Sequence, residues 1–236
     1  MTTPAVTTGA DTRRSTGPGW PELLIGLAVF ATVAYGLPTL LTRTGISDRL
    51  SPLITGLLLA ALSGLAGLAG FVAADRIRVR DRAAFGVRST SARWLLLGVA
   101  GGVLALVLAQ LIALAVLSFT GPAENVQAPY RDAAEGGVLS VVLSVLFLAV
   151  LTPIGEEFLF RGVVTTVLLR YGALIGVVGS SLIFALAHGL NIIFVTALVV
   201  GLITAELRRR SGSVWPGVLA HVVNNLVSQL LVVTLT

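Results

Sequence analysis

At residues 138–170 the chain reads VLSVVLSVLFLAVLTPIGEEFLFRGVVTTVLLR, an apolar run that contains a proline, two adjacent glutamates and an arginine. A helix needs about 20 apolar residues to cross a bilayer, so this run is longer than one crossing requires. Pro153 removes a backbone hydrogen bond and kinks a helix. We therefore expect one crossing up to about Arg161 and a bent or interfacial continuation to Arg170. A re-entrant pair of helices that meet at Pro153 is the alternative.

The composition of the whole chain agrees with a membrane protein. Of 236 residues, 56% are hydrophobic and 11% are charged, and the mean hydropathy is +0.96. A soluble domain is typically about 45–50% apolar and about 25% charged, so an ordinary globular enzyme and a disordered protein are both excluded. The chain has no cysteine, which excludes disulfides, iron–sulfur clusters and thiol catalysis. The net charge of +5 is better explained by orientation in a bilayer than by nucleic-acid binding.

Six further apolar runs accompany the first one. They lie at 22–42, 51–74, 93–119, 172–190, 192–207 and 214–235. The predicted fold class is therefore all-α, a polytopic transmembrane helix bundle of about seven to eight spans. Residues 1–20 are predicted to be a disordered cytoplasmic tail, and residues 21–236 a single transmembrane domain. Glycines at three- and four-residue spacing, such as Gly64 and Gly67, predict close helix–helix packing.

The arginines test the orientation of these spans. With seven crossings and a cytoplasmic N-terminus, twelve of the sixteen arginines fall on the cytoplasmic side and three on the outside, with Arg161 inside the membrane. The acidic 120–137 loop then falls outside. This distribution follows the positive-inside rule, so the sequence predicts a multi-pass cell-membrane protein with a cytoplasmic N-terminus.

Ionisable residues inside a span are costly and usually mark a functional site. Glu156 and Glu157 stand side by side in the 138–170 run, and Arg161 follows Glu157 by four residues, on the same helical face. We expect Arg161 to hold Glu157, while Glu156 faces a water-accessible cavity as a general base. The alternative is a purely structural role, in which both carboxylates only pair with Arg161.

Both histidines of the chain also lie in predicted spans. His188 follows Phe184 by four residues, and His221 precedes Asn225 by four residues on one helical face. Each residue alone could be a packed core group or a contact between helices. Together, a carboxylate, two imidazoles and a carboxamide form a set suited to hydrolysis. Glu156 and His188 could activate water, while His221 and Asn225 stabilise an oxyanion.

These motifs, in this order, resemble one family. Glu156-Glu157…Arg161, then Phe184…His188, then His221…Asn225 are similar to the motifs of the CPBP family. These are the CAAX-processing and bacteriocin-processing (Abi) intramembrane endopeptidases. The resemblance covers about residues 136–236.

The resemblance implies peptide-bond hydrolysis within the bilayer. It assigns water activation to Glu156 and His188, oxyanion stabilisation to His221 and Asn225, and a supporting role to Glu157, Arg161 and Phe184. We expect no cofactor. A zinc ion held by Glu156, His188 and His221 is the alternative, although the chain has no His-Glu-x-x-His motif.

A second class of function stays open at this stage. A proton-coupled membrane transporter could use the intramembrane glutamate and histidines as a relay. The expected partners are the lipid bilayer and a membrane-embedded or membrane-associated peptide, and no nucleic acid.

One geometric difficulty remains, because straight spans of equal length would leave His188 about 10 Å beyond the centre of its span and away from Glu156.

Overall fold

A computed structural model describes residues 17–121, 128 and 136–235, and for residues 231–235 the backbone alone. Every regular element in these residues is a helix, which confirms the all-α class. The predicted tail falls almost entirely on residues 1–16, and Arg131 and the acidic residues of the 120–137 loop fall on 122–127 and 129–135. Both predictions concern residues outside the described ones.

The helical elements follow one another along the chain without a strand between them in the described part. They are α1 (Trp20–Ala31), η1 (Thr32–Gly36), α2 (Leu37–Arg43), η2 (Ser47–Arg49), α3 (Pro52–Ile77), α4 (Ala92–Thr120), α6 (Val138–Val145), η3 (Leu146–Leu151), α7 (Thr152–Glu157), η4 (Phe158–Thr165), α8 (Thr166–Leu168), η5 (Leu169–Tyr171), η6 (Ile175–Gly179), α9 (Ser180–Leu186), α10 (Ile192–Ser211) and α11 (Trp215–Leu235).

Four helical stretches are long and apolar enough to cross a membrane. They are Trp20–Arg43, Pro52–Ile77, Ala92–Thr120 and Val138–Tyr171. The stretch Ile175–Leu186 is apolar but shorter. Helices α10 and α11, of 20 and 21 residues, complete the bundle. These helices are those of a membrane protein. The exact number of spans stays a prediction.

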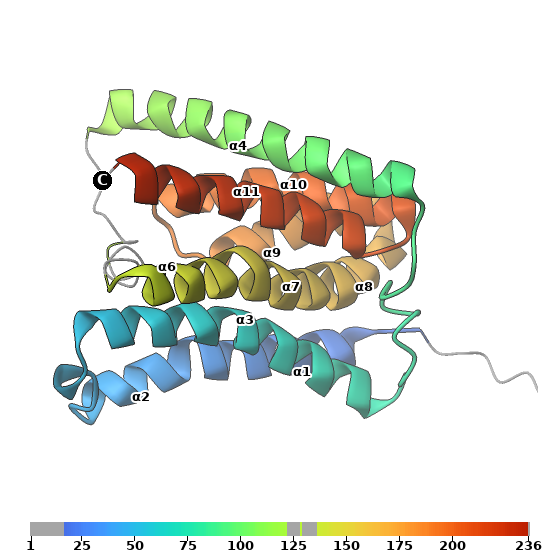
Figure 1. Ribbon diagram of the computed structural model, residues 1–236. Coiled ribbons are helices and arrows are strands. Elements are labelled where there is room, and N and C mark those ends of the chain that lie inside the picture. The colour runs from blue at the N-terminus through green and yellow to red at the C-terminus, as the bar shows by residue number, and fades with distance from the viewer. Residues whose placement is uncertain (1–16, 122–127, 129–135, 236) are drawn as a thin grey trace, which may run out of the picture.

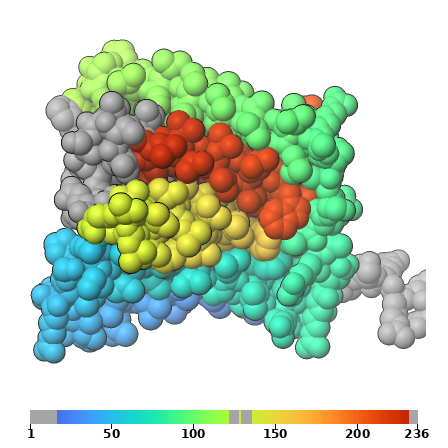
Figure 2. Space-filling view, viewed as in Figure 1, coloured from blue at the N-terminus to red at the C-terminus, as the bar shows by residue number. Residues whose placement is uncertain are grey.

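The stretch from α6 to η5 runs through the middle of the bundle. Figure 1 shows it between α3 on one side and α11 on the other, with α1 and α2 beyond α3, and α4 beyond α11. In Figure 2 the α6–α7 surface and α11 lie against each other on the visible face. Helix α9 packs on α10. The central stretch, which carries both glutamates, is thus covered from several directions.

The arginine-bearing connections meet at one end of the bundle. Arg170 donates to the carbonyl of Pro18, and Arg78 donates twice to Glu22. Arg88 donates to the carbonyl of Gly212. The segment before α1, the α3–α4 loop, the end of η5 and the α10–α11 loop therefore share one end, as the seven-crossing arrangement predicts. Which membrane face this end occupies stays a prediction.

Residues 138–171 form one continuous helical stretch of 34 residues. The alternative of a re-entrant helix pair that meets at Pro153 is therefore wrong. The helix passes the proline because the six residues before α7 adopt the wider π-helical form, a feature that is frequent at functional sites. A second π-helix, η4, follows the glutamates directly.

Glycines bring α3 and α7 into backbone contact. A Cβ atom placed on Gly67 would lie 2.3 Å from the carbonyl carbon of Gly155, and one on Gly155 would lie 2.0 Å from the carbonyl oxygen of Gly64. No other residue fits at such a distance. The packing role predicted for the α3 glycines is confirmed, and the contact lies immediately beside Glu156.

Candidate active site

Glu156 is buried in the middle of the bundle, with 4% of its side chain exposed. Its Oε1 accepts a hydrogen bond of 3.2 Å from Ser63, which α3 supplies directly before Gly64. Its Oε2 has no hydrogen-bond partner among the described groups. A buried carboxylate oxygen without a donor is costly, so this atom is set up for a contact that the protein itself does not make.

Both histidines approach that free oxygen. Nε2 of His188 and Nε2 of His221 each lie 3.9 Å from Glu156 Oε2. This distance is too long for a direct hydrogen bond and short enough for one water molecule to bridge the two atoms. Three residues from three helical segments therefore converge on one small polar volume.

The other ring nitrogen of each histidine defines how the ring is protonated. His188 Nδ1 lies 2.9 Å from the carbonyl of Phe184. A carbonyl only accepts, so Nδ1 carries the proton and Nε2 presents a lone pair to Glu156 when the ring is neutral. His221 Nδ1 lies 3.2 Å from Glu157 Oε1, and the same argument makes Nδ1 the donor. A protonated His221 could then also donate from Nε2.

Glu157 and Arg161 form the predicted pair, with 3.1 Å between Glu157 Oε2 and Arg161 Nε. Both side chains are fully buried. The Nε–H of Arg161 donates to Thr204 Oγ1 of α10 at 2.6 Å, and the Arg161 guanidinium lies 4.6 Å from the centre of the Phe184 ring. Glu157 thus joins a cation on one side to His221 on the other and holds both in place.

Asn225 makes different contacts from those expected for an oxyanion-binding group. Its Nδ2 donates to the carbonyl of Leu148 at 3.0 Å, and its Oδ1 accepts from Asn224 at 3.1 Å. Neither contact is made with Glu156 or with a histidine. Asn225 therefore ties α11 to η3, one helical turn from His221.

The geometric difficulty with His188 is resolved by the shape of its helix. Helix α9 ends at Leu186, and the chain turns at Gly189, whose φ is +83°. His188 therefore stands at the end of a short helix inside the bundle, near Glu156, rather than at the end of a full span. About a quarter (26%) of its side chain is exposed.

A cavity of about 440 Å³ adjoins His188. It lies between the α1–η1 segment and α9, and its walls are apolar apart from His188 and Tyr35. Glu156 is not among the residues that line this cavity. His188 is the site residue that connects the cavity to Glu156.

A metal ion at this site would need ligands from the histidines and the acidic side chains. In the described part of the chain, no group of three or more His, Asp or Glu side chains has a geometry that could hold an ion. In the set Glu156, His188 and His221, the Nε2 atom of each histidine lies 3.9 Å from Glu156 Oε2.

Three supporting residues were not found by the sequence motifs. Ser63 and Tyr35 lie in the N-terminal spans, which appeared featureless apart from their hydrophobicity, and Thr204 lies in α10. Each is a polar side chain in an apolar helix, and this is the signal that could have marked it.

Part of the chain matches a known protein family. Residues 138–227 match the family model described as Rce1-like, type II CAAX prenyl endopeptidase. The match begins at α6 and ends inside α11, so it includes every residue of the three motifs. It confirms the family that these motifs predicted. Searches among curated proteins and among solved structures gave no match.

Proposed function

We propose, from the match of residues 138–227 to a CAAX endopeptidase family, that this protein is an intramembrane endopeptidase. It hydrolyses a peptide bond of a membrane-associated peptide or protein with a water molecule activated by Glu156 and His188. The family match does not favour the transporter alternative.

One observation carries this proposal. The unpartnered Oε2 of buried Glu156 lies 3.9 Å from the Nε2 atoms of both histidines. A water molecule between them would hydrogen-bond the carboxylate and the lone pair of His188 together. That arrangement orients and polarises the water, as general-base catalysis requires.

The proposed reaction conserves its protons. Water attacks the peptide carbonyl carbon while its proton passes to Glu156 Oε2. The tetrahedral oxyanion is stabilised by a protonated His221, which donates from Nε2 while Glu157 accepts from Nδ1. The carbon–nitrogen bond then breaks, and Glu156 returns the proton to the leaving amine. A buried Arg161 balances one of the two carboxylate charges throughout.

Asn225 takes a different role in this proposal from the one the resemblance implies. With its amide donating to Leu148, Asn225 positions the helix that carries His221. Contact between Asn225 and a substrate would require that bond to be exchanged.

The substrate approaches from within the bilayer. The apolar cavity beside His188 lies between two helical segments, and its lining suits an apolar portion of a membrane-associated substrate. An extended peptide next to this portion would place a carbonyl beside His188.

The test compares three forms of the full chain in native-like membranes. Glu156→Gln removes the base and keeps the shape of the side chain, so we expect peptide cleavage to fall by at least about 10²-fold. Glu206→Gln is the matched control, because Glu206 pairs with Arg209 on the surface of α10 and exposed pairs contribute little. The readout is accumulation of uncleaved membrane peptides, by mass spectrometry. Unchanged cleavage by a folded Glu156→Gln variant would refute the assignment.

A chelator added to the wild-type protein addresses the zinc alternative. We expect cleavage to continue, because the proposed steps use only protein groups and water. Loss of cleavage with a chelator, and its return with added zinc, would contradict the metal-free reaction.

A further inference from the structure

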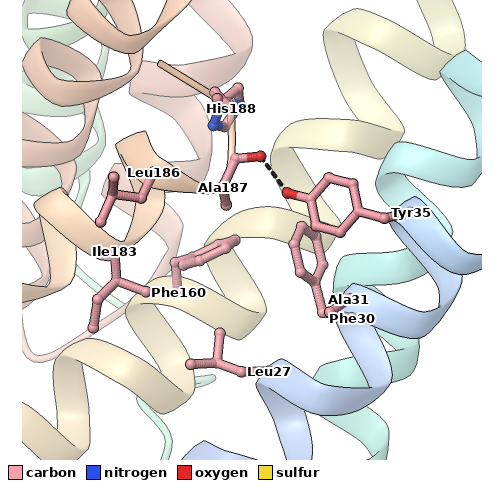
Figure 3. Close-up of a pocket in the computed structure, with 10 residues that line it drawn as sticks. Leu27, Phe30, Ala31, Tyr35, Phe160, Ile183, Leu186, Ala187 and His188 are labelled. Carbon is pink, nitrogen blue, oxygen red and sulfur yellow. Dashed lines mark hydrogen bonds between the residues drawn. The ribbon is translucent and has the colours of Figure 1, made fainter.

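Tyr35 reaches the candidate site from a part of the chain that the family match does not include. It lies in η1, in the first span, and its hydroxyl donates a hydrogen bond to the carbonyl of Ala187. Figure 3 shows the Tyr35 side chain extending from the α1–η1 side toward the α9 side, next to His188. The bond thus joins two elements 152 positions apart in the chain.

The Ala187 carbonyl needs an outside donor. It follows the last residue of α9, and the final carbonyls of a helix have no partner within the helix. The turn satisfies its neighbours, since Gly189 N–H donates to Leu186 and Asn191 donates to His188. Among the described residues, the Tyr35 hydroxyl is the group that donates to Ala187. This bond connects the turn that carries His188 to the first span.

The Tyr35 ring is also held by contacts with other aromatic rings. It packs edge-on against Phe30, with 6.0 Å between the ring centres. Phe30 packs on Phe160, which packs on Phe184, and Phe184 packs on His188 at 4.6 Å. Aromatic edge-to-face pairs of this kind are directional, so the first span is connected to His188 both through rings and through the hydroxyl.

The Tyr35 hydroxyl makes no hydrogen bond to Glu156, Glu157 or either histidine ring among the described contacts. Its direct partner is the backbone next to His188.

We propose that Tyr35 is a positioning residue of this site: by holding the Ala187 carbonyl, it fixes the turn at the end of α9 so that His188 Nε2 points at Glu156. This inference rests on the proposed function for its effect on cleavage, and on the geometry alone for its effect on the turn. It gives the N-terminal span a part in catalysis that the three motifs do not contain.

The test removes one oxygen atom. Tyr35→Phe keeps the ring and loses the bond to Ala187. Tyr171→Phe is the matched control, because Tyr171 is exposed to a similar degree, 51% against 48%, and its hydroxyl accepts a hydrogen bond from Trp20 near the other end of the first helix. Both variants keep the full chain and are compared with the wild type in the same membranes.

Two measurements are made on each variant. Hydrogen exchange at residues 187–190 should become faster in Tyr35→Phe and stay at the wild-type rate in Tyr171→Phe. For cleavage, kcat should fall about threefold to tenfold in Tyr35→Phe, with KM nearly unchanged and a displaced pH profile, because His188 is less well held. Tyr171→Phe should keep the wild-type kcat and pH profile.

Each result supports or overturns the inference. Unchanged exchange in Tyr35→Phe, or equal changes in both variants, shows that the bond does not hold the turn. Faster exchange with unchanged kcat and pH profile shows that the turn does not position His188. If the wild type shows no Glu156-dependent cleavage, the proposed function fails, and the exchange measurement alone then decides whether Tyr35 holds the turn.

Discussion

Asn225 satisfies a carbonyl that the central helix leaves without a partner. In the π-helix η3, the N–H of Thr152 donates to Phe147, five residues back. The next carbonyl in that register is Leu148, and the residue that should donate to it is Pro153, which has no N–H. The side-chain amide of Asn225 donates to Leu148 instead, at 3.0 Å. One proline in the central helix therefore explains one asparagine in α11.

This explanation predicts a coupling between the two residues. Asn225→Ala should destabilise the protein by about 1–3 kcal/mol, because the half-buried Leu148 carbonyl loses its donor. In a Pro153→Ala background the alanine N–H becomes available, so the same Asn225→Ala change should cost clearly less. The measurement is a double-mutant cycle of unfolding free energies in detergent. An equal cost in both backgrounds would contradict the explanation.

The other site residues show which part of the chemistry a sequence can reveal. The i, i+4 spacing of Glu157 and Arg161 predicted their pairing, and the structure has it at 3.1 Å. No local spacing could predict that His221 would reach Glu157 from α11, or that Ser63 would reach Glu156 from α3. Those contacts depend on how distant helices pack, which a motif within one helix does not encode.

At the scale of elements, the contact between α3 and α7 decides where Glu156 lies. Gly64 and Gly67 meet Gly155 backbone to backbone, and this approach brings Ser63 to within 3.2 Å of Glu156. Glycine spacing predicted close packing, but it did not identify the partner helix. The partner is known only from the structure, because several helices of the chain carry small residues.

The contact can be tested with one methyl group. Gly155→Ala places a Cβ 2.0 Å from the carbonyl oxygen of Gly64, so the helices must separate. We expect a loss of stability of about 1–3 kcal/mol and reduced cleavage, because Ser63 no longer reaches Glu156. Thermal unfolding and cleavage are both measured. Gly179→Ala is the control, since its Cβ would lie 3.4 Å from Leu168 Cδ1, an ordinary contact, and it should behave as wild type. Equal effects in the two variants would argue against the backbone contact.

At the scale of the whole molecule, composition predicted the class and the order of the long helices. It did not predict the length of α9. The apolar run 172–190 resembled a full span, whereas the structure ends that helix at Leu186 and turns at Gly189. Hydropathy reports how apolar a segment is, and it does not report where a turn ends a helix and pairs its backbone carbonyls with side chains such as Asn191 and Tyr35.

The end of the bundle where the arginine-bearing loops meet should face the cytoplasm, because Arg and Lys are retained on that side during insertion. The chain has no cysteine, so one introduced thiol can be labelled alone. Ser91→Cys, directly before α4, should be protected from a membrane-impermeant maleimide in intact cells and labelled after permeabilisation. Thr44→Cys, after α2 at the opposite end, should be labelled in both conditions. Labelling of Ser91→Cys but not Thr44→Cys in intact cells would invert the orientation and place the N-terminus outside.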